Sequence, residues 1–232
     1  MTLKQIMESY KKQTEFVQNA AHELRTPLTI IQAKQELLLQ EPESKIIDKS
    51  EDINIMLKET KRLTKLIKEL MVLAMADSNE LKMHKEKTNV DNLIKEIIIP
   101  YKDFAEMQEK QINIDLNYGK ESNIDRNKIN QLLVIILDNA IKYTAEKDTI
   151  TVKTYSKEGK CVIEVADTGI GISKEAAKHV FDRFYREDKA RSREKGGTGL
   201  GLSIAHTIVK LHGGNIKITS NEPKGAKVII KI

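Results

Sequence analysis

Mostly apolar residues in the first third of the chain recur at alternating steps of four and three, which is the spacing of a narrow heptad seam on a packed helix. One seam is formed by Tyr10, Thr14, Val17, Ala21, Leu24, Leu28, Ile31, Gln35 and Leu38, and a second by Ile53, Met56, Thr60, Leu63, Ile67, Leu70 and Ala74. The residues Glu41-Pro42-Glu43-Ser44 between them predict a short turn. Because two helices with narrow seams cannot enclose a core alone, residues 1–78 are expected to form a helical hairpin that dimerises into a four-helix bundle.

The periodicity changes after a polar stretch at residues 76–80. Two-residue alternation predicts strands at 112–116, 150–152, 163–165, 216–218 and 228–232. Helical patterns lie between them at about 90–107, 127–143, 173–184 and 200–212, and Gly213-Gly214 ends the last one. Helices covering one sheet give an α/β sandwich over residues 79–232, so the whole chain is expected to be an α+β protein with two domains.

Charge and cysteine content narrow the function classes. Lys and Arg total 39 against 34 Asp and Glu, and the net charge of +5 is spread along the chain rather than gathered into a basic arm. We therefore expect no nucleic-acid partner, and only a weak preference for anions such as nucleotides. The single cysteine, Cys161, cannot form an internal disulfide or a multi-cysteine metal site, which fits a reducing compartment.

The longest uninterrupted apolar run, residues 132–137, is far shorter than the roughly 18 residues of a membrane-spanning helix. The chain begins inside a helical pattern, without a signal peptide or a capping residue. We therefore expect it to be part of a longer protein.

His22 follows the seam residue Ala21, so its side chain is expected to point away from the seam and toward solvent. A histidine with an ordinary pKa is mostly neutral near pH 7, and one ring nitrogen then keeps a lone pair for nucleophilic attack. Glu23 is placed to accept a hydrogen bond from the other ring nitrogen, and Pro27 is expected to kink the helix. Taken alone, a surface histidine beside a glutamate is more often structural or incidental than catalytic.

Two stretches of the second part carry polar groups suited to a nucleotide. On the helix at 127–143, Ile135, Asn139 and Lys142 share a stripe outside the apolar face, although a mid-helix asparagine is usually only a solvated residue. Asp167 ends a strand and enters a turn whose glycines, Gly169 and Gly171, allow close approach of a ligand. An aspartate there suits the exocyclic amine of adenine, but plain tight turns use the same residues.

Residues 196–204 read Gly-Gly-Thr-Gly-Leu-Gly-Leu-Ser-Ile at the start of a helix, where glycine N–H groups converge on phosphate. A flexible hinge fits this cluster equally well, and its spacing is neither that of a P-loop nor that of a dinucleotide fingerprint. The charged stretch at 186–195 has no apolar periodicity and predicts a mobile lid over a polyphosphate.

Five segments in this order resemble the H-box, N-box, first glycine box, F-box and second glycine box of sensor histidine kinases. They lie at 16–31, with His-Glu-Leu-Arg-Thr-Pro at the centre, and at 137–144, 167–172, 181–186 and 196–204. The resemblance covers about residues 10–232. It implies a dimerisation and phosphoacceptor hairpin followed by a Bergerat-type ATP-binding domain.

The resemblance also implies roles for single residues. In the hairpin, His22 would be phosphorylated, Glu23 would assist proton transfer, and Thr26 would position water for dephosphorylating a response regulator. In the second domain, Asn139 would ligate Mg²⁺, Lys142 would meet phosphate, Tyr143 would pack near the nucleotide and Asp167 would read adenine. The glycine boxes would contribute Gly169, Gly171, Gly197, Thr198, Gly199, Leu200 and Gly201.

The implied protein is a homodimeric kinase that uses ATP and Mg²⁺, autophosphorylates on His22, and relays the phosphoryl group to an aspartate in the receiver domain of a response regulator. Phosphatase activity toward that regulator belongs to the same expectation. The chain would be a cytoplasmic domain of a membrane-anchored protein, attached only through segments absent from this chain.

The sequence departs from the family at Ile135, where an N-box often carries a second asparagine, so one metal or phosphate contact is expected to be missing. Two alternatives stay open: an ATPase of the same nucleotide fold without a histidine acceptor, and a scaffold that has lost kinase activity and signals by dimer contacts. The other histidines, His84, His179, His206 and His212, have no metal-ligand spacing and are expected to be structural or surface residues.

Overall fold

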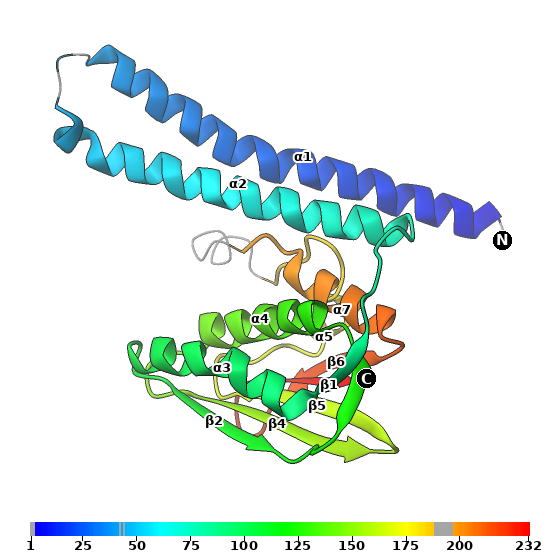
Figure 1. Cartoon of the computed structure of the whole chain (residues 1–232). Coiled ribbons are helices and arrows are strands. Elements are labelled where there is room, and N and C mark those ends of the chain that lie inside the picture. Colours follow the sequence, from blue (N-terminus) through cyan, green and yellow to red (C-terminus); the bar gives the residue numbers. More distant parts are fainter. Residues whose placement is uncertain (1–2, 42, 44, 188–196) are drawn as a thin grey trace.

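The computed structural model describes residues 3–41, 43, 45–187 and 197–232. Its first part is an antiparallel hairpin of two long helices (Figure 1), made of α1 (Leu3–Gln40) and α2 (Ser50–Asp77), with the short 3-10 helix η1 (Ile46–Lys49) before α2. Lys34 of α1 pairs with Asp52 of α2 at 2.6 Å, which ties the two helices near the turn. The helix α1 continues without a break through the buried Pro27.

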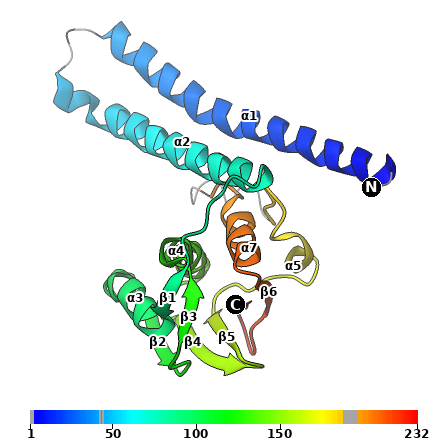
Figure 2. The same cartoon turned by 45° about the vertical axis from the view of Figure 1, so that its right-hand side comes forward.

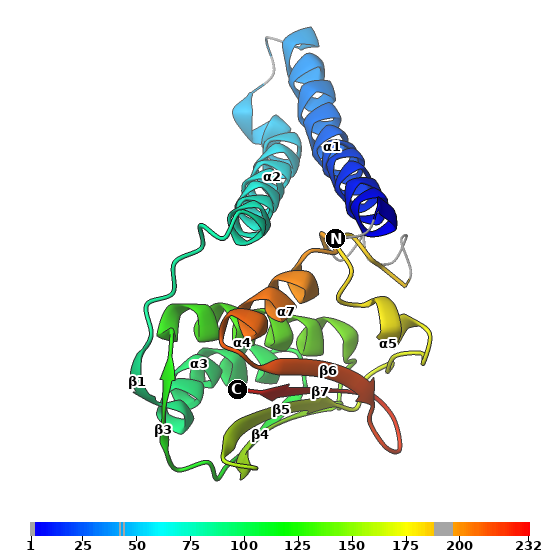
Figure 3. The ribbon, with the colours of Figure 1, turned by 90° about the vertical axis from the view of Figure 1, so that its right-hand side faces the viewer.

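The second part is a five-stranded sheet covered on one face by helices (Figure 3), as expected for an α/β sandwich. The strand order is β2 (Gln111–Leu116), β4 (Thr149–Lys157), β5 (Lys160–Asp167), β7 (Ala226–Lys231) and β6 (Asn215–Ser220). Only β2 and β4 pair in parallel. The covering helices are α3 (Val90–Glu106), α4 (Arg126–Tyr143) and α7 (Gly201–Leu211).

The core of this part follows the predicted periodicities. The apolar face of α4 is buried as expected, and it packs in one cluster with inward-facing strand residues such as Ile150 and Ile163. The N-terminus of α4 is capped by Asp125, whose side chain accepts a hydrogen bond from the backbone N–H of Lys128. Asn89 caps α3 in the same way, through the N–H of Asn92.

One local prediction fails, and one small sheet was not predicted. The helix expected at 173–184 is only α5 (Ala176–His179). The residues after it form turns, and Phe184, which has a φ of 62°, donates its N–H to the carbonyl of Gly199. The small sheet of β1 (Glu86–Asn89) and β3 (Glu121–Ile124) was missed because both strands are short and mostly polar. Among the described residues, none of the helices is both long enough and apolar enough to cross a membrane.

The helix α2 has a second apolar face that the seam did not indicate. Leu66 and Leu73 are buried, whereas the seam residue Ile67 is 48% exposed. Leu66 and Leu73 belong to one apolar cluster with Leu200 and Ile204, and Figure 2 shows the C-terminal half of α2 lying against α7. The hairpin is therefore docked on the second part through a face beside its seam, and the seam residue Leu70 borders the same cluster.

Candidate active site

His22 lies exposed on α1, in agreement with the phase of the seam. The hydroxyl of Thr26, one turn later, donates a long hydrogen bond of 3.4 Å to the carbonyl of His22. The carboxylate of Glu23 was expected to accept a hydrogen bond from His22, but it does not contact that ring. Its Oε2 accepts a hydrogen bond from Arg186 at 2.9 Å and lies 3.5 Å from Arg62 of α2.

This contact belongs to a half-buried charge cluster of two carboxylates and two guanidinium groups. The side chain of Arg186 is 6% exposed, and its Nε has no partner among the described residues. Glu59 lies 3.6 Å from Arg62, and its Oε2 is likewise buried without a hydrogen bond within the described ranges. Sequence reasoning missed Arg62 and Glu59, because nothing near them in the chain indicates that they meet Glu23.

The F-box residues also dock on the hairpin. Arg183 donates two hydrogen bonds to Asp77, at 2.8 and 2.6 Å, and its guanidinium carbon lies 4.8 Å from the ring centroid of Phe16. The ring of Phe184 lies 5.8 Å from the same Phe16 ring. These contacts hold the segment before the expected lid against α1 and α2. Residues 188–196, which contain most of the expected lid and Gly196, lie outside the described residues.

The last turn of α4 carries the N-box residues on a fixed backbone. The hydroxyl of Thr144 donates to Ala140 O at 2.8 Å, and the amine of Lys110 donates to Ile141 O at 2.8 Å, so carbonyls at the helix end are satisfied. Asn139 is half-buried, and the amine of Lys142 lies 5.3 Å from the ring centroid of Tyr143.

Asp167 is held at the end of β5 with one carboxylate oxygen directed into a backbone cradle. Its Oδ1 accepts hydrogen bonds from the N–H groups of Gly169 and Ala226, at 2.9 and 3.2 Å. Its Oδ2 accepts none from the described part of the chain, so it remains available to an external donor such as an amine. Burial raises the pKa of Asp167, and the two backbone N–H groups lower it.

The loop between β6 and β7 completes this cradle, a role that no motif in the sequence indicated. The side chain of Asn221 donates to the carbonyl of Asp167 at 2.9 Å. A Cβ at Gly225 would lie 1.8 Å from that carbonyl, and a Cβ at Gly169 would lie 2.2 Å from the carbonyl of Tyr143. Only glycine permits these approaches, so the N-box and the first glycine box form one continuous surface.

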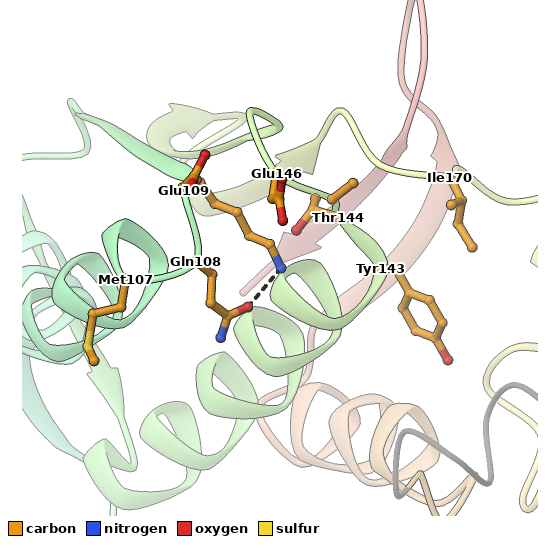
Figure 4. A pocket seen from close by; sticks show the side chains of 9 residues that line it. Met107, Gln108, Glu109, Tyr143, Thr144, Glu146 and Ile170 are labelled. Carbon is orange, nitrogen blue, oxygen red and sulfur yellow. Dashed lines mark hydrogen bonds between the residues drawn. The ribbon is translucent and has the colours of Figure 1, made fainter.

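A pocket of about 710 Å³ opens beside this surface (Figure 4). It lies between the turn after α3 and the end of α4, and Tyr143 and Ile170 line the side nearest the first glycine box. In Figure 4 the ring of Tyr143 points away from Gln108 and Glu146. The pocket therefore reaches the first glycine box at Ile170.

The second glycine box forms the entry to α7. Gly199 has a φ of 77°, and a Cβ there would lie 2.9 Å from the Cα of Phe184. Thr198 is buried; its hydroxyl accepts from the N–H of Leu200 at 3.3 Å and donates to Glu69 of α2 at 2.6 Å. Leu200 is fully buried, and Gly197 is half-buried.

Ile135 has a packing role at the position where the family often has asparagine. A Cβ at Gly201 would lie 3.2 Å from Ile135 Cγ2, so this side chain fills the contact between α4 and the first residue of α7. Among the described residues, no group of three or more His, Cys, Asp or Glu side chains is arranged around a metal position.

The other histidines and the cysteine are in structural surroundings. His212 accepts a hydrogen bond from the N–H of Asp125, and the ring of His206 lies 5.5 Å from that of Phe181. His179 contacts Asp182 at 3.0 Å on the surface. Cys161 is fully buried, which raises its pKa to about 12.

Two family models match the chain. The model described as His Kinase A (phospho-acceptor) domain matches residues 12–79. The model described as Histidine kinase-, DNA gyrase B-, and HSP90-like ATPase matches residues 124–232.

Among curated proteins, the chain is similar to the signal transduction histidine-protein kinase ArlS of Staphylococcus aureus (strain USA300). The two are 40% identical over 224 residues, which cover 96% of this chain and 49% of ArlS. The chain thus spans about half the length of the curated relatives it matches.

Among solved structures, the chain is similar to the Acinetobacter baumannii histidine kinase AdeS, with a TM-score of 0.72, 25% identity and coverage of 91% of this chain and 96% of that one. Histidine kinase ThkA, solved in complex with the response regulator protein TrrA, matches with a TM-score of 0.75 and 24% identity over 100% of this chain and 67% of that one. The likeness to ThkA concerns the fold.

Proposed function

The chain belongs to the sensor histidine kinases, and we propose that it transfers the γ-phosphoryl group of ATP to His22 and relays it to an aspartate of a response regulator. One observation supports the proposal most strongly. Arg186, which ends the F-box, contacts Glu23, the residue next to His22, although the two are 163 positions apart in the sequence. Elements attributed to the nucleotide site and to the phosphoacceptor therefore already meet.

The hairpin supplies the acceptor. His22 is exposed, so its neutral ring is open to an approaching phosphoryl group. Glu23 is close enough in the chain to take a proton from that ring once it leaves Arg186 and Arg62. In this reading, release of Glu23 accompanies the movement that brings the nucleotide to His22.

The second domain binds ATP with Mg²⁺. Support comes from the glycines at 169, 199 and 225, which let the chain's own loops pack closely around Asp167 and Tyr143 and before α7, and from the available Oδ2 of Asp167. Asp167 would read the adenine amine, and Tyr143 would pack near the base. Lys142 and the N–H groups of residues 197–201 would hold the phosphates, and Asn139 would ligate the metal.

Magnesium neutralises phosphate charge during phosphoryl transfer. Because the side chain of Ile135 is apolar and packed against Gly201, it would offer the metal no oxygen, and Asn139 would remain as the N-box amide that ligates it.

The hairpin is proposed to dimerise. The seam residues Tyr10, Val17, Leu28, Ile53 and Ile67 are all exposed in the single chain, and a second copy would cover them in a four-helix bundle. We place the domain division at residues 78 and 79, with the dimerisation and phosphoacceptor hairpin at 1–78 and the ATP-binding domain at 79–232.

The partner in relay is proposed to be the receiver domain of a response regulator, by analogy with ThkA, which was solved with TrrA. Thr26 lies one turn from His22, on the exposed surface that such a partner would meet, and is proposed to position water for phosphatase activity. Membrane attachment of a longer cytoplasmic protein would come through segments absent from this chain.

The test is incubation with γ-labelled ATP and Mg²⁺. We expect a phosphoprotein that is stable to alkali and labile to acid, and that is absent in His22→Ala and in Asn139→Ala. Label that persists in His22→Ala would overturn the assignment. ATP hydrolysis without any labelled protein would favour a plain ATPase, and neither hydrolysis nor label would favour a scaffold.

A further inference from the structure

Among the described residues, α2 contacts the second glycine box through one polar bond, from Thr198 to Glu69, inside an apolar interface. Leu66 and Leu73 are 2% and 0% exposed, and Glu69 lies three and four residues from them on the same helical face. On the other side, Leu200 and Ile204 are fully buried in the same cluster. Packing of these leucines therefore fixes where the Glu69 carboxylate lies.

The bond itself is short and joins a carboxylate to the loop. The hydroxyl of Thr198 donates to Glu69 Oε2 at 2.6 Å, a distance typical of a hydrogen bond to a charged acceptor. Thr198 also accepts from the N–H of Leu200, the residue that precedes the first turn of α7. Glu69 thus lies beside a helix N-terminus, where the aligned peptide dipoles favour negative charge.

The same loop is where the proposed function locates the phosphates of ATP. The Glu69 carboxylate and the phosphates of ATP are both anions. They would occupy neighbouring positions against the hydrogen-bond donors of the second glycine box. At the short separations that such a loop imposes, their repulsion is strong because little water screens it. Burial raises the pKa of Glu69 and so disfavours its charged form, while the hydrogen bond from Thr198 and then the charge of Lys65 lower the pKa. Withdrawal of α2 would return the carboxylate to water.

We propose that Glu69 is an internal anion that competes with the phosphates of ATP for the second glycine box, so that docking of α2 lowers the affinity for ATP. The proposal rests on the proposed function, because it requires that residues 197–201 hold phosphate. Coupling of this kind is reciprocal: if docked α2 weakens ATP binding, bound ATP weakens the docking of α2 to the same extent. A displacement of α2 by an upstream signal would then tune nucleotide binding.

The experiment measures affinity for a non-hydrolysable ATP analogue with Mg²⁺, and for adenosine, by titration calorimetry. Glu69→Gln keeps an oxygen acceptor for Thr198 and removes the charge. We expect it to bind the ATP analogue about fivefold more tightly or better, with adenosine affinity changed less than about twofold because adenosine has no charge to repel.

The matched control is Glu51→Gln. Glu51 is exposed in the first turn of the same helix, 18 residues from Glu69, or about 27 Å along the axis. Glu51→Gln makes the same change of charge as Glu69→Gln, but Glu51 does not contact the loop. The affinity of this control variant for both ligands is therefore expected to equal that of the wild type.

The outcomes separate the two proposals. If the wild type binds neither ligand, the proposed nucleotide site itself is wrong. If the wild type binds the analogue and Glu69→Gln binds it no better than Glu51→Gln, the competition is wrong while the nucleotide site stands. An equal gain for adenosine and the analogue would also overturn it, since it would show a general change in packing rather than relief of charge.

Hydrogen exchange provides a second readout that does not depend on a variant. In the wild type, the ATP analogue is expected to speed exchange of the α2 amides around residues 66–73, because that face loses its cover. Unchanged exchange there, together with protection in the second glycine box, would show that nucleotide binding leaves α2 docked.

Discussion

Arg186 donates a hydrogen bond of 2.9 Å to the carboxylate of Glu23, joining the end of the F-box to the residue beside the proposed phosphoacceptor. The two side chains are only 6% and 16% exposed. Removing one partner of such a pair is more destabilising than removing one partner of a surface pair, because the remaining charge is left poorly solvated.

A double-mutant cycle measures this coupling. For Arg186→Gln and Glu23→Gln we expect an interaction free energy of about 0.5–3 kcal/mol in urea unfolding. The exposed pair Lys178 and Glu175, at 2.8 Å, is the control and is expected to give about 0–1 kcal/mol. Equal couplings in the two cycles would show that the Arg186 contact does not hold the domains together.

Thr26→Ala is expected to keep autophosphorylation and to lose most dephosphorylation of the partner regulator. The hydroxyl makes only a 3.4 Å bond to the His22 carbonyl, so its loss costs the helix little. Thr29→Ala is the matched control, because Thr29 is exposed and makes the same bond to Arg25, at 3.0 Å. Release of phosphate from the labelled regulator is the measurement, and equal rates in the two variants would remove Thr26 from its proposed role.

Asp167→Asn is expected to weaken ATP binding and to stabilise the fold near pH 7. Its Oδ1 keeps both backbone hydrogen bonds, but the new amide would face the adenine amine donor to donor, at a cost of about 5- to 100-fold in affinity. Calorimetry with the ATP analogue measures that loss, and unchanged affinity would mean that Asp167 does not read the base.

The pH dependence follows from the direction of the pKa. Burial raises the pKa of Asp167 in the folded protein above its unfolded value. Its favourable contribution is therefore complete below the unfolded pKa and is lost as the pH rises through the folded pKa. The gain in thermal midpoint of Asp167→Asn should accordingly be present at pH 7 and shrink as the pH falls toward about 4.

Gly169→Ala is expected to weaken ATP binding by at least about tenfold, because the new Cβ would lie 2.2 Å from the carbonyl of Tyr143. Gly119→Ala is the control. Gly119 has a φ of 65° with nothing within 4 Å of a Cβ, so only about 1 kcal/mol of backbone strain is added there. If Gly169→Ala binds the ATP analogue as well as Gly119→Ala does, the close approach has no part in the site.

Ile67→Glu is expected to convert a dimer into monomers in analytical ultracentrifugation. Ile67 is on the seam of α2 and is 48% exposed in the single chain, and a buried unpaired carboxylate at a dimer interface is costly. Lys68→Glu, an exposed neighbour off the seam, should leave the dimer intact. A monomeric wild type would contradict the proposed bundle directly.

Sequence periodicity was sufficient for elements whose contacts repeat locally. The apolar face of α4 and the alternating strands around Ile150 and Ile163 were read correctly, because one-sided burial imposes its period on neighbouring residues. It failed at residues 173–184, where two aromatics spaced as on a helix instead belong to a turn fixed by the Phe184 bond to Gly199.

The sequence by itself determined the family motifs, the two-part architecture and the solvent-facing position of His22. Only the tertiary structure decided that Leu66 and Leu73 form a second face of α2, that Glu23 pairs with Arg186 and Arg62, and that Glu69 reaches Thr198. These contacts join residues up to 163 positions apart, so the local periodicity of the sequence cannot predict them. The contacts depend on how the hairpin packs against the second domain. That packing is determined by the shapes of the two domain surfaces, and not by residues that are neighbours along the chain.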